Sequence, residues 1–278
     1  MQKIYDLHCH SSASDGVLSP KEVVQRAYDN QVSVLALTDH DSVAGLDEAQ
    51  AQADLLGITL INGVEISTQW ENRAIHIVGL DFDKTHPKMT ALLQQQAEKR
   101  LERAVKIGEK LAKLGVENAF DGAKKFTQGE VTRAHYARYL VEIGKVSNIN
   151  QAFKRYLGQG KSAYVKAEWV DIPSAIDIIH QAGGVAVLAH PLRYTLTTKW
   201  LKKLIADFAQ SGGDAIEVSG CGQTKDQRLL LARWALEQGL LGSVGSDFHF
   251  PCGWIELGHS LELPENVPPV WQKFRTIW

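Results

Sequence analysis

The sequence predicts an α/β protein in which strands alternate with helices. Short apolar runs typical of buried strands lie at residues 4–7, 32–38, 58–66, 74–80, 185–189, 215–218 and 240–244. Helical patterns separate several of these runs, and with 44% hydrophobic residues the 278-residue chain can bury a large core. Alternation of this kind predicts a parallel sheet with helices outside. Seven strands are enough for a closed or nearly closed barrel, and an open doubly wound sheet is the alternative.

Local signals mark the ends of the expected helices. The helices span residues 20–28, 174–181 and 200–210, and a proline or threonine that favours a helix start precedes or begins each one. Glycines at 183–184, 212–213 and 239 follow helical segments and favour their ends. These signals support the assignment of strand and helix in turn along the chain.

The alternation stops between about residues 88 and 167, where the pattern is helical and basic. We therefore predict a small helical domain over residues 96–166, inserted into a barrel formed by residues 1–95 and 167–278. Residues 98–166 contain fifteen Lys and Arg and seven Asp and Glu, which gives this segment a net charge of +8. Because the whole chain has a net charge of −2, the remaining residues carry about −10. A basic insert beside an acidic barrel suggests an anionic substrate above carboxylates that metal ions neutralise. Ordinary solvated helix faces would give the same charges.

Composition narrows the setting in which the protein works. The three cysteines, Cys9, Cys221 and Cys252, form no C-x-x-C pair and are odd in number, which argues against a disulfide framework or a zinc ribbon. The first residues lack the features of a secretory signal, and no apolar run approaches the ~20 residues of a membrane helix. We expect a cytoplasmic protein, a monomer that does not act at a membrane.

Histidines and carboxylates follow the predicted strands at their carboxyl ends. His8 and His10 are two residues apart, so both side chains point to one face of the first strand, and Asp247 with His249 repeats this spacing. The carboxyl ends of barrel strands open onto one rim, where such enzymes keep their active sites. The candidate metal ligands are His8, His10, Asp15, His40, Glu65, His76, His190, Asp247 and His249.

The number and type of these side chains predict the kind of metal site. Six of the ten histidines fall at these positions, whereas His86, His180 and His259 lie elsewhere and have ordinary explanations. Asp15 could equally be only a turn residue in its serine-rich segment. Nine ligands exceed what one ion accepts, so we expect two or three divalent ions. Imidazole and carboxylate ligands without thiolate favour Mn²⁺, Zn²⁺ or Fe²⁺, and we expect Mn²⁺ first.

The motifs resemble those of the PHP (polymerase and histidinol phosphatase) superfamily. The matching segments are DLHCH at 6–10, SDG at 14–16, TDHD at 38–41, GVEI at 63–66, IHI at 75–77, AHP at 189–191 and GSDFH at 245–249. The resemblance implies a distorted seven-stranded (β/α)7 barrel with three metal ions on its carboxyl-terminal rim. Asp15 stands where some members have a histidine.

The same resemblance implies a distribution of the ligands over three ions. The implied sets are His8, His10, Glu65 and Asp247 for one ion, Asp15, His40 and His249 for a second, and Glu65, His76 and His190 for a third. Glu65 would be shared between two ions. We expect Glu65, His190 and His249 to be essential for catalysis, and Glu217, at another strand end, to have a supporting or merely structural role.

Within the superfamily, the chain is most similar to the bacterial RNase AM group, also known as nucleoside 3′,5′-bisphosphate phosphatases. That similarity implies 5′-to-3′ exoribonuclease activity on short 5′-phosphorylated RNA, in rRNA 5′-end maturation or oligoribonucleotide turnover, and hydrolysis of the 3′-phosphate of pAp. Arg133 and His135, at a predicted helix start after Thr132, are our candidates for binding the 5′-phosphate. Arg138, Lys161 and Lys166 are weaker candidates.

Three other functions remain open from the sequence. A phosphatase of another small phosphate monoester, similar to histidinol phosphatases, would use the same metal site. A metal-dependent amidohydrolase also uses an H-x-H rim, but typically with fewer carboxylates and a carboxylated lysine, and no lysine ends a predicted strand. A nucleic-acid-binding or structural metal protein would have no activity at all.

Overall fold

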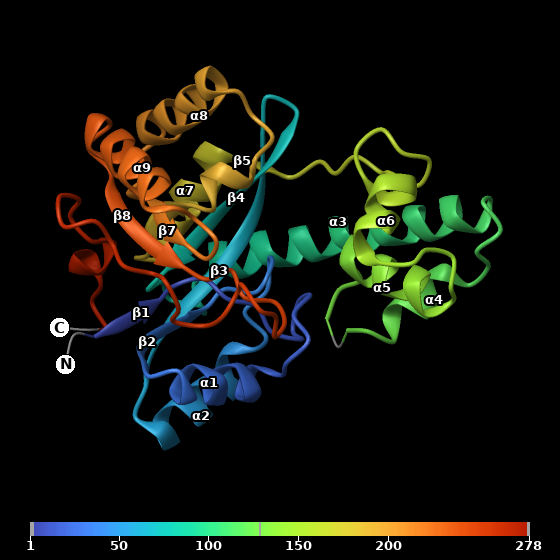
Figure 1. Cartoon of the computed structure of the whole chain (residues 1–278), viewed down its shortest axis with the longest axis horizontal. Coiled ribbons are helices and arrows are strands. Elements are labelled where there is room, and N and C mark those ends of the chain that lie inside the picture. Colours follow the sequence, from blue (N-terminus) through green and yellow to red (C-terminus); the bar gives the residue numbers. More distant parts are fainter. Residues whose placement is uncertain (1–2, 128, 277–278) are drawn as a thin grey trace.

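The computed structural model describes residues 3–127 and 129–276 of the chain. Its strands are β1 (Ile4–Asp6), β2 (Val32–Leu37), β3 (Thr59–Trp70), β4 (Arg73–Leu80), β5 (Val170–Asp171), β6 (Val185–Leu188), β7 (Ala215–Gly220) and β8 (Leu241–Gly245). The seven predicted strands are confirmed, and β5 is a short addition that pairs with β3. The sheet lies in the left half of the molecule in Figure 1.

Hydrogen bonds bring the last strand of the sheet back to the first. The strand order is β1-β2-β3-β4-β6-β7-β8. The amide of Leu7 donates to the carbonyl of Val244 at 3.1 Å, and the amide of His10 donates to that of Phe248 at 2.8 Å. The chain segments that follow β1 and β8 therefore lie side by side, and the predicted barrel closes through them.

One strand runs against the predicted parallel direction. β4 is antiparallel to both β3 and β6, so the expectation of parallel strands throughout is wrong here. Only Glu71 and Asn72 separate β3 from β4, and both have positive φ angles, 46° and 61°, as in the two-residue turns that favour tight hairpins. In an antiparallel strand the beginning, not the end, lies at the carboxyl-terminal rim.

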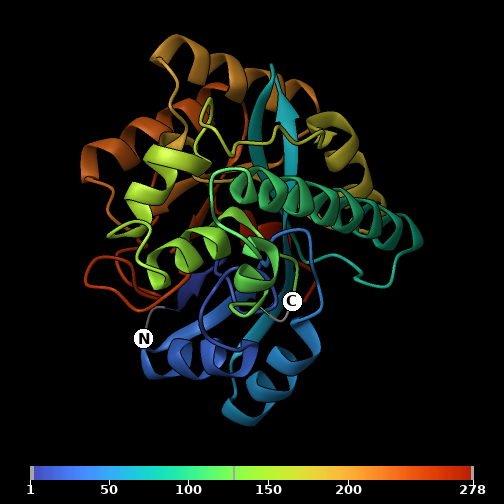
Figure 2. The same ribbon diagram turned by 90° about the vertical axis from the view of Figure 1, so that its right-hand side faces the viewer.

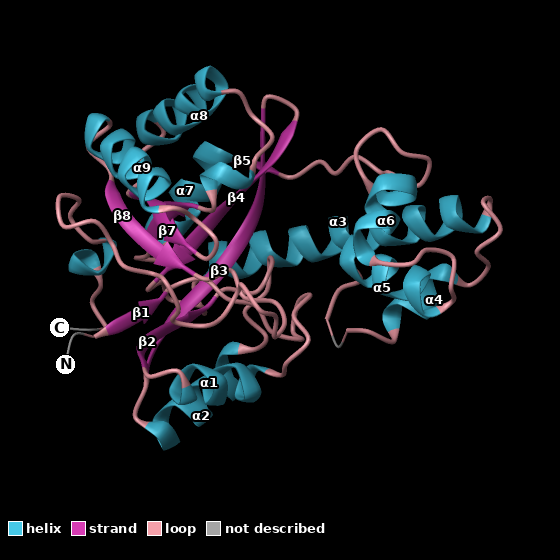
Figure 3. Ribbon diagram, viewed as in Figure 1, coloured by secondary structure: helices cyan, strands magenta, loops and turns pink. Residues whose placement is uncertain are grey.

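Helices cover the outside of the sheet (Figure 3). The α-helices are α1 (Pro20–Asp29), α2 (Leu46–Leu56), α3 (Pro87–Ala112), α4 (Ala119–Lys124), α5 (Arg133–Glu142), α6 (Ile149–Ala152), α7 (Ile172–Gln181), α8 (Thr198–Gln210) and α9 (Lys225–Glu237). A π-helical turn, Phe153–Leu157, extends α6, and 3₁₀ turns lie at Pro191–Arg193 and Val270–Lys273. Among the described residues, no helix has both the length and the apolar character required to cross a membrane.

The barrel interior is filled by apolar side chains from its own strands. Leu7, Val34, Ile61, Val187 and Ala215 belong to one buried cluster, to which strands on all sides of the sheet contribute. Phe274, near the end of the chain, packs into the same cluster. The barrel is therefore a packed core, and its functional side chains lie at the rim.

Helix α3 connects two separate cores. Met89 and Leu92 in its first half pack with the barrel, whereas Ile107 and Leu111 in its second half pack with α4, α5 and α6. The second core extends from Ala104 to Ala163, and the helices around it lie in front of the sheet in Figure 2. The predicted domain boundary at residue 96 falls inside α3, and the division itself stays a prediction.

Candidate metal centre and substrate pocket

The nine predicted ligands lie together at one rim of the barrel. His8 and His10 follow β1, His40 follows β2, Glu65 lies in β3, His76 in β4, His190 follows β6, Asp247 and His249 follow β8, and Asp15 lies before α1. A continuous set of contacts between 2.8 and 3.7 Å joins all nine. His76 reaches this rim because β4 is antiparallel and His76 lies near its beginning.

The carboxylate of Glu65 is the centre of the cluster. Its Oε1 lies 2.9 Å from both His76 Nδ1 and His190 Nε2, and its Oε2 lies 2.8 Å from His40 Nδ1. Burial raises the pKa of Glu65, but the surrounding His76 and His40 outweigh this effect and hold the pKa well below its usual range. Glu65 therefore carries its negative charge at neutral pH although its side chain is fully buried.

The spacing of the His8 and His10 side-chain nitrogens fits metal coordination. His8 Nε2 and His10 Nε2 lie 3.1 Å apart, close to the separation of about 3.0–3.4 Å between adjacent ligands placed ~2.1 Å from one ion. Burial and the neighbouring His249 and His40 lower the pKa of His10 to about 3, which keeps its ring neutral and able to bind a metal. Buried polar atoms without a hydrogen-bond partner occur on His10, Asp15, His40, Glu65, His76 and His190. A bound cation would satisfy such atoms, so the donor set fits the expected ions.

The ligand atoms fall into three overlapping groups. These groups are His8, His10 and Glu65; His10, Asp15, His40 and His249; and His40, Glu65 and His76. They correspond closely to the three sets implied by the resemblance. The differences are that Asp247 is missing from the first group, that His10 joins the second and that His40 takes the place of His190 in the third.

Buried carboxylates outside the cluster hold its ligands in place. Glu217 contacts His8 Nδ1 at 2.5 Å and accepts the backbone amide of His190 at 2.6 Å, so one side chain orients two predicted ligands. Asp39 accepts hydrogen bonds from the hydroxyl groups of Ser11 and Ser14, at 2.6 and 2.5 Å, and fixes the loop that carries Asp15. The role of Asp39 was not predicted, although it stands beside His40 in the motif.

Backbone conformation at the strand ends is unusual for non-glycine residues. His190 has φ 29°, Asp247 has φ 53° and Asp41 has φ 49°. Such positive φ values cost energy and persist where the surrounding structure enforces them, often at functional sites. His190 and Asp247, which have this positive-φ conformation, are themselves predicted metal ligands.

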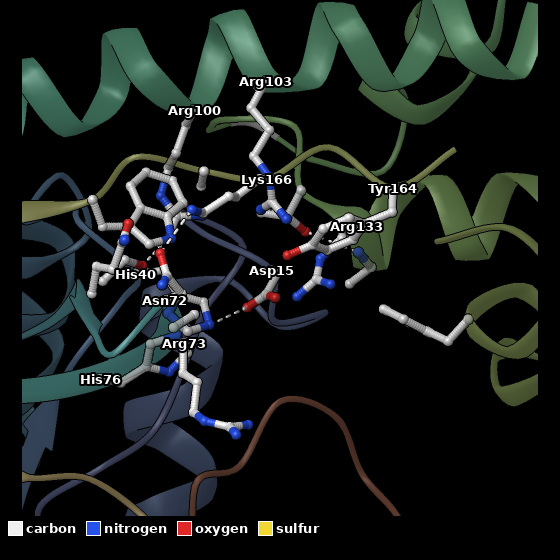
Figure 4. A pocket seen from close by; sticks show the side chains of 18 residues that line it. Asp15, His40, Asn72, Arg73, His76, Arg100, Arg103, Arg133, Tyr164 and Lys166 are labelled. Atoms are coloured by element: carbon white, nitrogen blue, oxygen red, sulfur yellow. Dashed lines mark hydrogen bonds and ion pairs between the residues drawn. The ribbon is translucent and has the colours of Figure 1, made fainter. Parts of the chain in front are cut away.

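A pocket lined by cationic side chains lies beside the cluster, between the rim and the inserted helices (Figure 4). Asp15, His40 and His76 form part of its wall, so the pocket opens onto the predicted metal ligands. Its cationic side chains are Arg73, Arg100, Arg103, Arg133 and Lys166, and its other lining residues are Ser67, Gln69, Asn72, Ala74, Thr132, Ala134, Phe153, Tyr164, Ala167 and Trp169.

Three of these arginines, Arg73, Arg103 and Arg133, form no ion pair with a described carboxylate. Arg100 forms an ion pair with Asp41 at 2.6 Å, whereas no described carboxylate lies within ion-pair distance of Arg103 or Arg133. Burial, followed by the charges of Arg133 and Arg100, lowers the pKa of Arg103 to about 10. The guanidinium groups of Arg100, Arg103 and Arg133 repel one another in this half-buried pocket, so a bound anion would stabilise them.

The predicted phosphate-binding residues have different places. Arg133 lies at the start of α5 and lines the pocket. Lys166 also lines the pocket, and its ammonium group donates to Asn72 Oδ1 at 3.0 Å. His135 is fully buried and accepts the Thr132 amide through Nδ1 at 2.9 Å, which completes the cap of α5. Arg138 donates to the backbone carbonyl of Asp15 at 2.6 Å. Lys161 is exposed and does not line the pocket.

Arg100 and Arg103 line the pocket although they were not among the predicted phosphate-binding residues. They are three residues apart on α3, so they lie on one face of that helix. Trp169, which also lines the pocket, packs against both, with the two guanidinium carbons 5.2 and 5.9 Å from the centre of its ring. The i, i+3 spacing of two arginines on a helix of the basic insert was the available signal.

A barrel with this donor set at its rim and an anion pocket beside it is the architecture of a metal-dependent phosphoesterase. The chain belongs to the PHP family, since residues 6–182 match the family model described as "PHP domain". The resemblance deduced from the motifs is thereby confirmed.

Relatives cover nearly the whole chain. A protein of Haemophilus influenzae named "5'-3' exoribonuclease" is 70% identical over 99% of this chain and 100% of its own length. A "3',5'-nucleoside bisphosphate phosphatase" of Chromobacterium violaceum is 42% identical over 96% of this chain and 95% of its own. A solved structure described as an amidohydrolase from Chromobacterium violaceum with bound SO4 and no metal is 41% identical, with a TM-score of 0.91 over 97% of this chain and 95% of that one.

Proposed function

We propose that the protein removes nucleotides from the 5′ end of short 5′-phosphorylated RNA and hydrolyses the 3′-phosphate of nucleoside 3′,5′-bisphosphates such as pAp. The observation that carries the proposal is that Arg103 and Arg133, without carboxylate partners, share one pocket with His40 and His76. A 5′-phosphate bound by the arginines would leave the 3′-phosphate of the same nucleotide near the cluster. The names of the relatives from Haemophilus influenzae and Chromobacterium violaceum support both activities.

The nine clustered residues would hold two or three divalent ions, with Mn²⁺ as the first choice and Zn²⁺ or Fe²⁺ as alternatives. Such ions, when bound, favour ionised water at neutral pH and stabilise negative charge on phosphoryl oxygens. We assign Glu65, His190 and His249 as the residues on which turnover depends most. Glu65 contacts ligands of all three groups, His190 contacts Glu65 at 2.9 Å, and His249 Nε2 lies 3.2 Å from Asp15.

The 5′-phosphate would bind between α3 and the start of α5. Arg133 lies in the first turn of α5, where the free amides of the helix end add to the positive potential. Arg103 and Lys166 would contribute further charge, and Tyr164 and Trp169 offer flat surfaces to the nucleoside. We propose that His135 acts through its cap of α5, which positions Arg133.

The two activities break the same bond. Water adds to phosphorus, the bond from phosphorus to the 3′-oxygen breaks, and the 3′-oxygen takes up a proton. With pAp the products are a nucleoside 5′-monophosphate and inorganic phosphate. With RNA the phosphate stays on the remaining strand and becomes its new 5′-phosphate, so the next cycle can begin. The three cysteines are free thiols, which supports work in the reducing cytoplasm.

Phosphate release from pAp and from 3′-AMP tests the proposal, because 3′-AMP lacks only the anchoring 5′-phosphate. In Mn²⁺ we expect kcat/KM to be about 10- to 100-fold higher for pAp, since hydrogen bonds to charged groups contribute ~1.5–3 kcal/mol, and EDTA should abolish both reactions. Histidinol phosphate and a cyclic amide serve as comparison substrates. Equal rates on pAp and 3′-AMP, or faster hydrolysis of either comparison substrate, would contradict the proposal.

A further inference from the structure

A second pocket lies on the other side of the cluster. It is lined by His190 and Asp247 of the cluster, by Glu217, and by Arg193, Gln223 and Gln227. These residues belong to β6, β7, β8 and the segments that follow them, whereas the first pocket is lined from β2, β3, β4 and the insert. The two pockets therefore lie on opposite parts of the rim, with the predicted metal ligands between them.

We infer that this second pocket binds the nucleotide on the 3′ side of the bond that is cleaved. The inference rests on the proposed function and specifies how RNA is held. An RNA strand passes in order from its 5′-phosphate through the first nucleoside to the scissile phosphate and then to the second nucleoside. If the 5′-phosphate lies in the first pocket and the scissile phosphate at the cluster, the second nucleotide continues toward the second pocket.

The lining of the second pocket suits a ribose phosphate. The guanidinium of Arg193 contacts Asp247, and 45% of its side chain is exposed, so it places positive charge at the boundary between cluster and pocket. Gln223 Oε1 accepts the Gly220 amide at 2.9 Å, and Gln227 Oε1 accepts the Thr224 amide at 2.9 Å. Each glutamine thus uses its oxygen for the backbone and keeps its amide NH₂ as a donor for a phosphate or ribose oxygen.

A chain segment that carries an exposed aromatic side chain passes beside this pocket. Cys221, which lines the pocket, donates to the carbonyl of Glu256 at 3.5 Å, so the segment after β8 passes beside it. Trp254, two residues before Glu256, is 78% exposed. Bases of single-stranded nucleic acid stack on such side chains without a requirement for sequence. A nucleoside 3′,5′-bisphosphate ends at the cluster, so only RNA would use the second pocket.

The variants Gln223→Glu and Gln227→Glu test this inference. Both keep the oxygen that accepts the backbone amide, and Glu at position 227 preserves the capping box of α9. They replace an NH₂ donor with an anionic oxygen that repels phosphate. Gln238→Glu, at the opposite end of α9, is the matched control for the added charge.

The double variant should lower kcat/KM for 5′-phosphorylated ApA at least about tenfold relative to kcat/KM for pAp. The reason is that the dinucleotide loses a charge-assisted contact in the second pocket and is repelled by the new carboxylates. Trp254→Ala should raise KM for the dinucleotide and leave KM for pAp nearly unchanged. In EDTA, where hydrolysis stops, the double variant should also bind the dinucleotide more weakly relative to pAp. A parallel loss on both substrates, or no loss on either, would overturn the inference. Failure of the wild-type protein to hydrolyse pAp would instead contradict the proposed function.

Discussion

Glu65 shows how one residue can organise a polar cluster. Its carboxylate has no exposed surface and lies within 3.4 Å of His8, His10, His40, His76 and His190. A buried carboxylate surrounded by imidazoles is stable only with compensating positive charge, which protons or metal ions can provide. The family resemblance implied that Glu65 is shared between two ions, and Glu65 belongs to two of the three groups of ligand atoms.

Replacing Glu65 tests this role directly. Glu65→Gln keeps the size of the side chain but removes its charge, so the purified protein should lose at least one bound ion and kcat for pAp should fall at least about 100-fold, as substitutions that disturb a metal site commonly do. Elemental analysis and kinetics measure the two effects. Glu262→Gln, whose side chain is 81% exposed, is the control. Full metal content with undiminished turnover would exclude the shared-ligand role.

We propose that Arg133 determines the preference for substrates that carry a 5′-phosphate over substrates that lack one. Arg133→Ala should lower kcat/KM for pAp about 10- to 100-fold, mostly through KM, and leave 3′-AMP hydrolysis nearly unchanged. Arg155→Ala is the matched control, because Arg155 is an exposed arginine of the insert that does not line the pocket. An equal effect of Arg133→Ala on both substrates would show that the 5′-phosphate binds elsewhere.

At the level of elements, the insert does more than form a pocket wall. Arg138 on α5 donates to the Asp15 carbonyl at 2.6 Å, and Thr127 donates to the Ser14 carbonyl at 3.1 Å. A side chain at Gly129 would clash with the Ala13 carbonyl, since its Cβ would lie 2.2 Å from that oxygen. The loop that carries Asp15 is thus held by the barrel through Asp39 and by the insert.

Arg138 should therefore affect metal binding rather than substrate specificity. Arg138→Ala should weaken the binding of one ion about 10-fold, the lower end of the effect seen when groups that support ligands are removed. Titration calorimetry with Mn²⁺ measures the change, and Arg138→Lys should restore part of it. A change confined to KM for 5′-phosphorylated substrates, with metal affinity intact, would favour the weaker sequence-based assignment of Arg138 to phosphate.

Elements with local signals were predictable, and elements set by distant contacts were not. Ser19, Thr132 and Thr197 each accept a hydrogen bond from the first turn of the helix that they precede, so propensity and structure agree there. The reversal of β4 depends on positive φ at Glu71 and Asn72, of which only Asn favours that conformation. Arg193 was missed because its proximity to Asp247 depends on how separate strands meet.

The whole molecule combines an acidic barrel with a basic insert. The insert faces the cluster across the first pocket, and the cations Arg103 and Arg133 line that pocket. The sequence could not reveal that the second core begins inside α3, because a continuous helix shows no boundary in its pattern. Which residues form the second pocket also depends on barrel closure, which no local pattern contains.

Metal removal should destabilise the whole protein. Ions that bind only the folded state stabilise it by about 2.7 kcal/mol at a concentration 100 times Kd, which corresponds to a rise of roughly 5–10 °C in Tm for a domain of this size. Thermal unfolding in EDTA, followed by titration of Mn²⁺ back into the sample, measures the shift. A Tm that does not depend on Mn²⁺ would indicate that the cluster does not bind ions in the folded state.

At the scale of the whole molecule, we propose that RNA is hydrolysed at the nine-residue cluster while its 5′-phosphate is bound in the first pocket. The most direct measurement follows products over time from one short RNA carrying either a 5′-phosphate or a 5′-hydroxyl group, in Mn²⁺. We predict successive release of nucleoside 5′-monophosphates from the 5′ end of the phosphorylated strand and little release from the hydroxyl strand. Release from the 3′ end, internal cleavage, or equal rates on both strands would contradict hydrolysis from a bound 5′-phosphate.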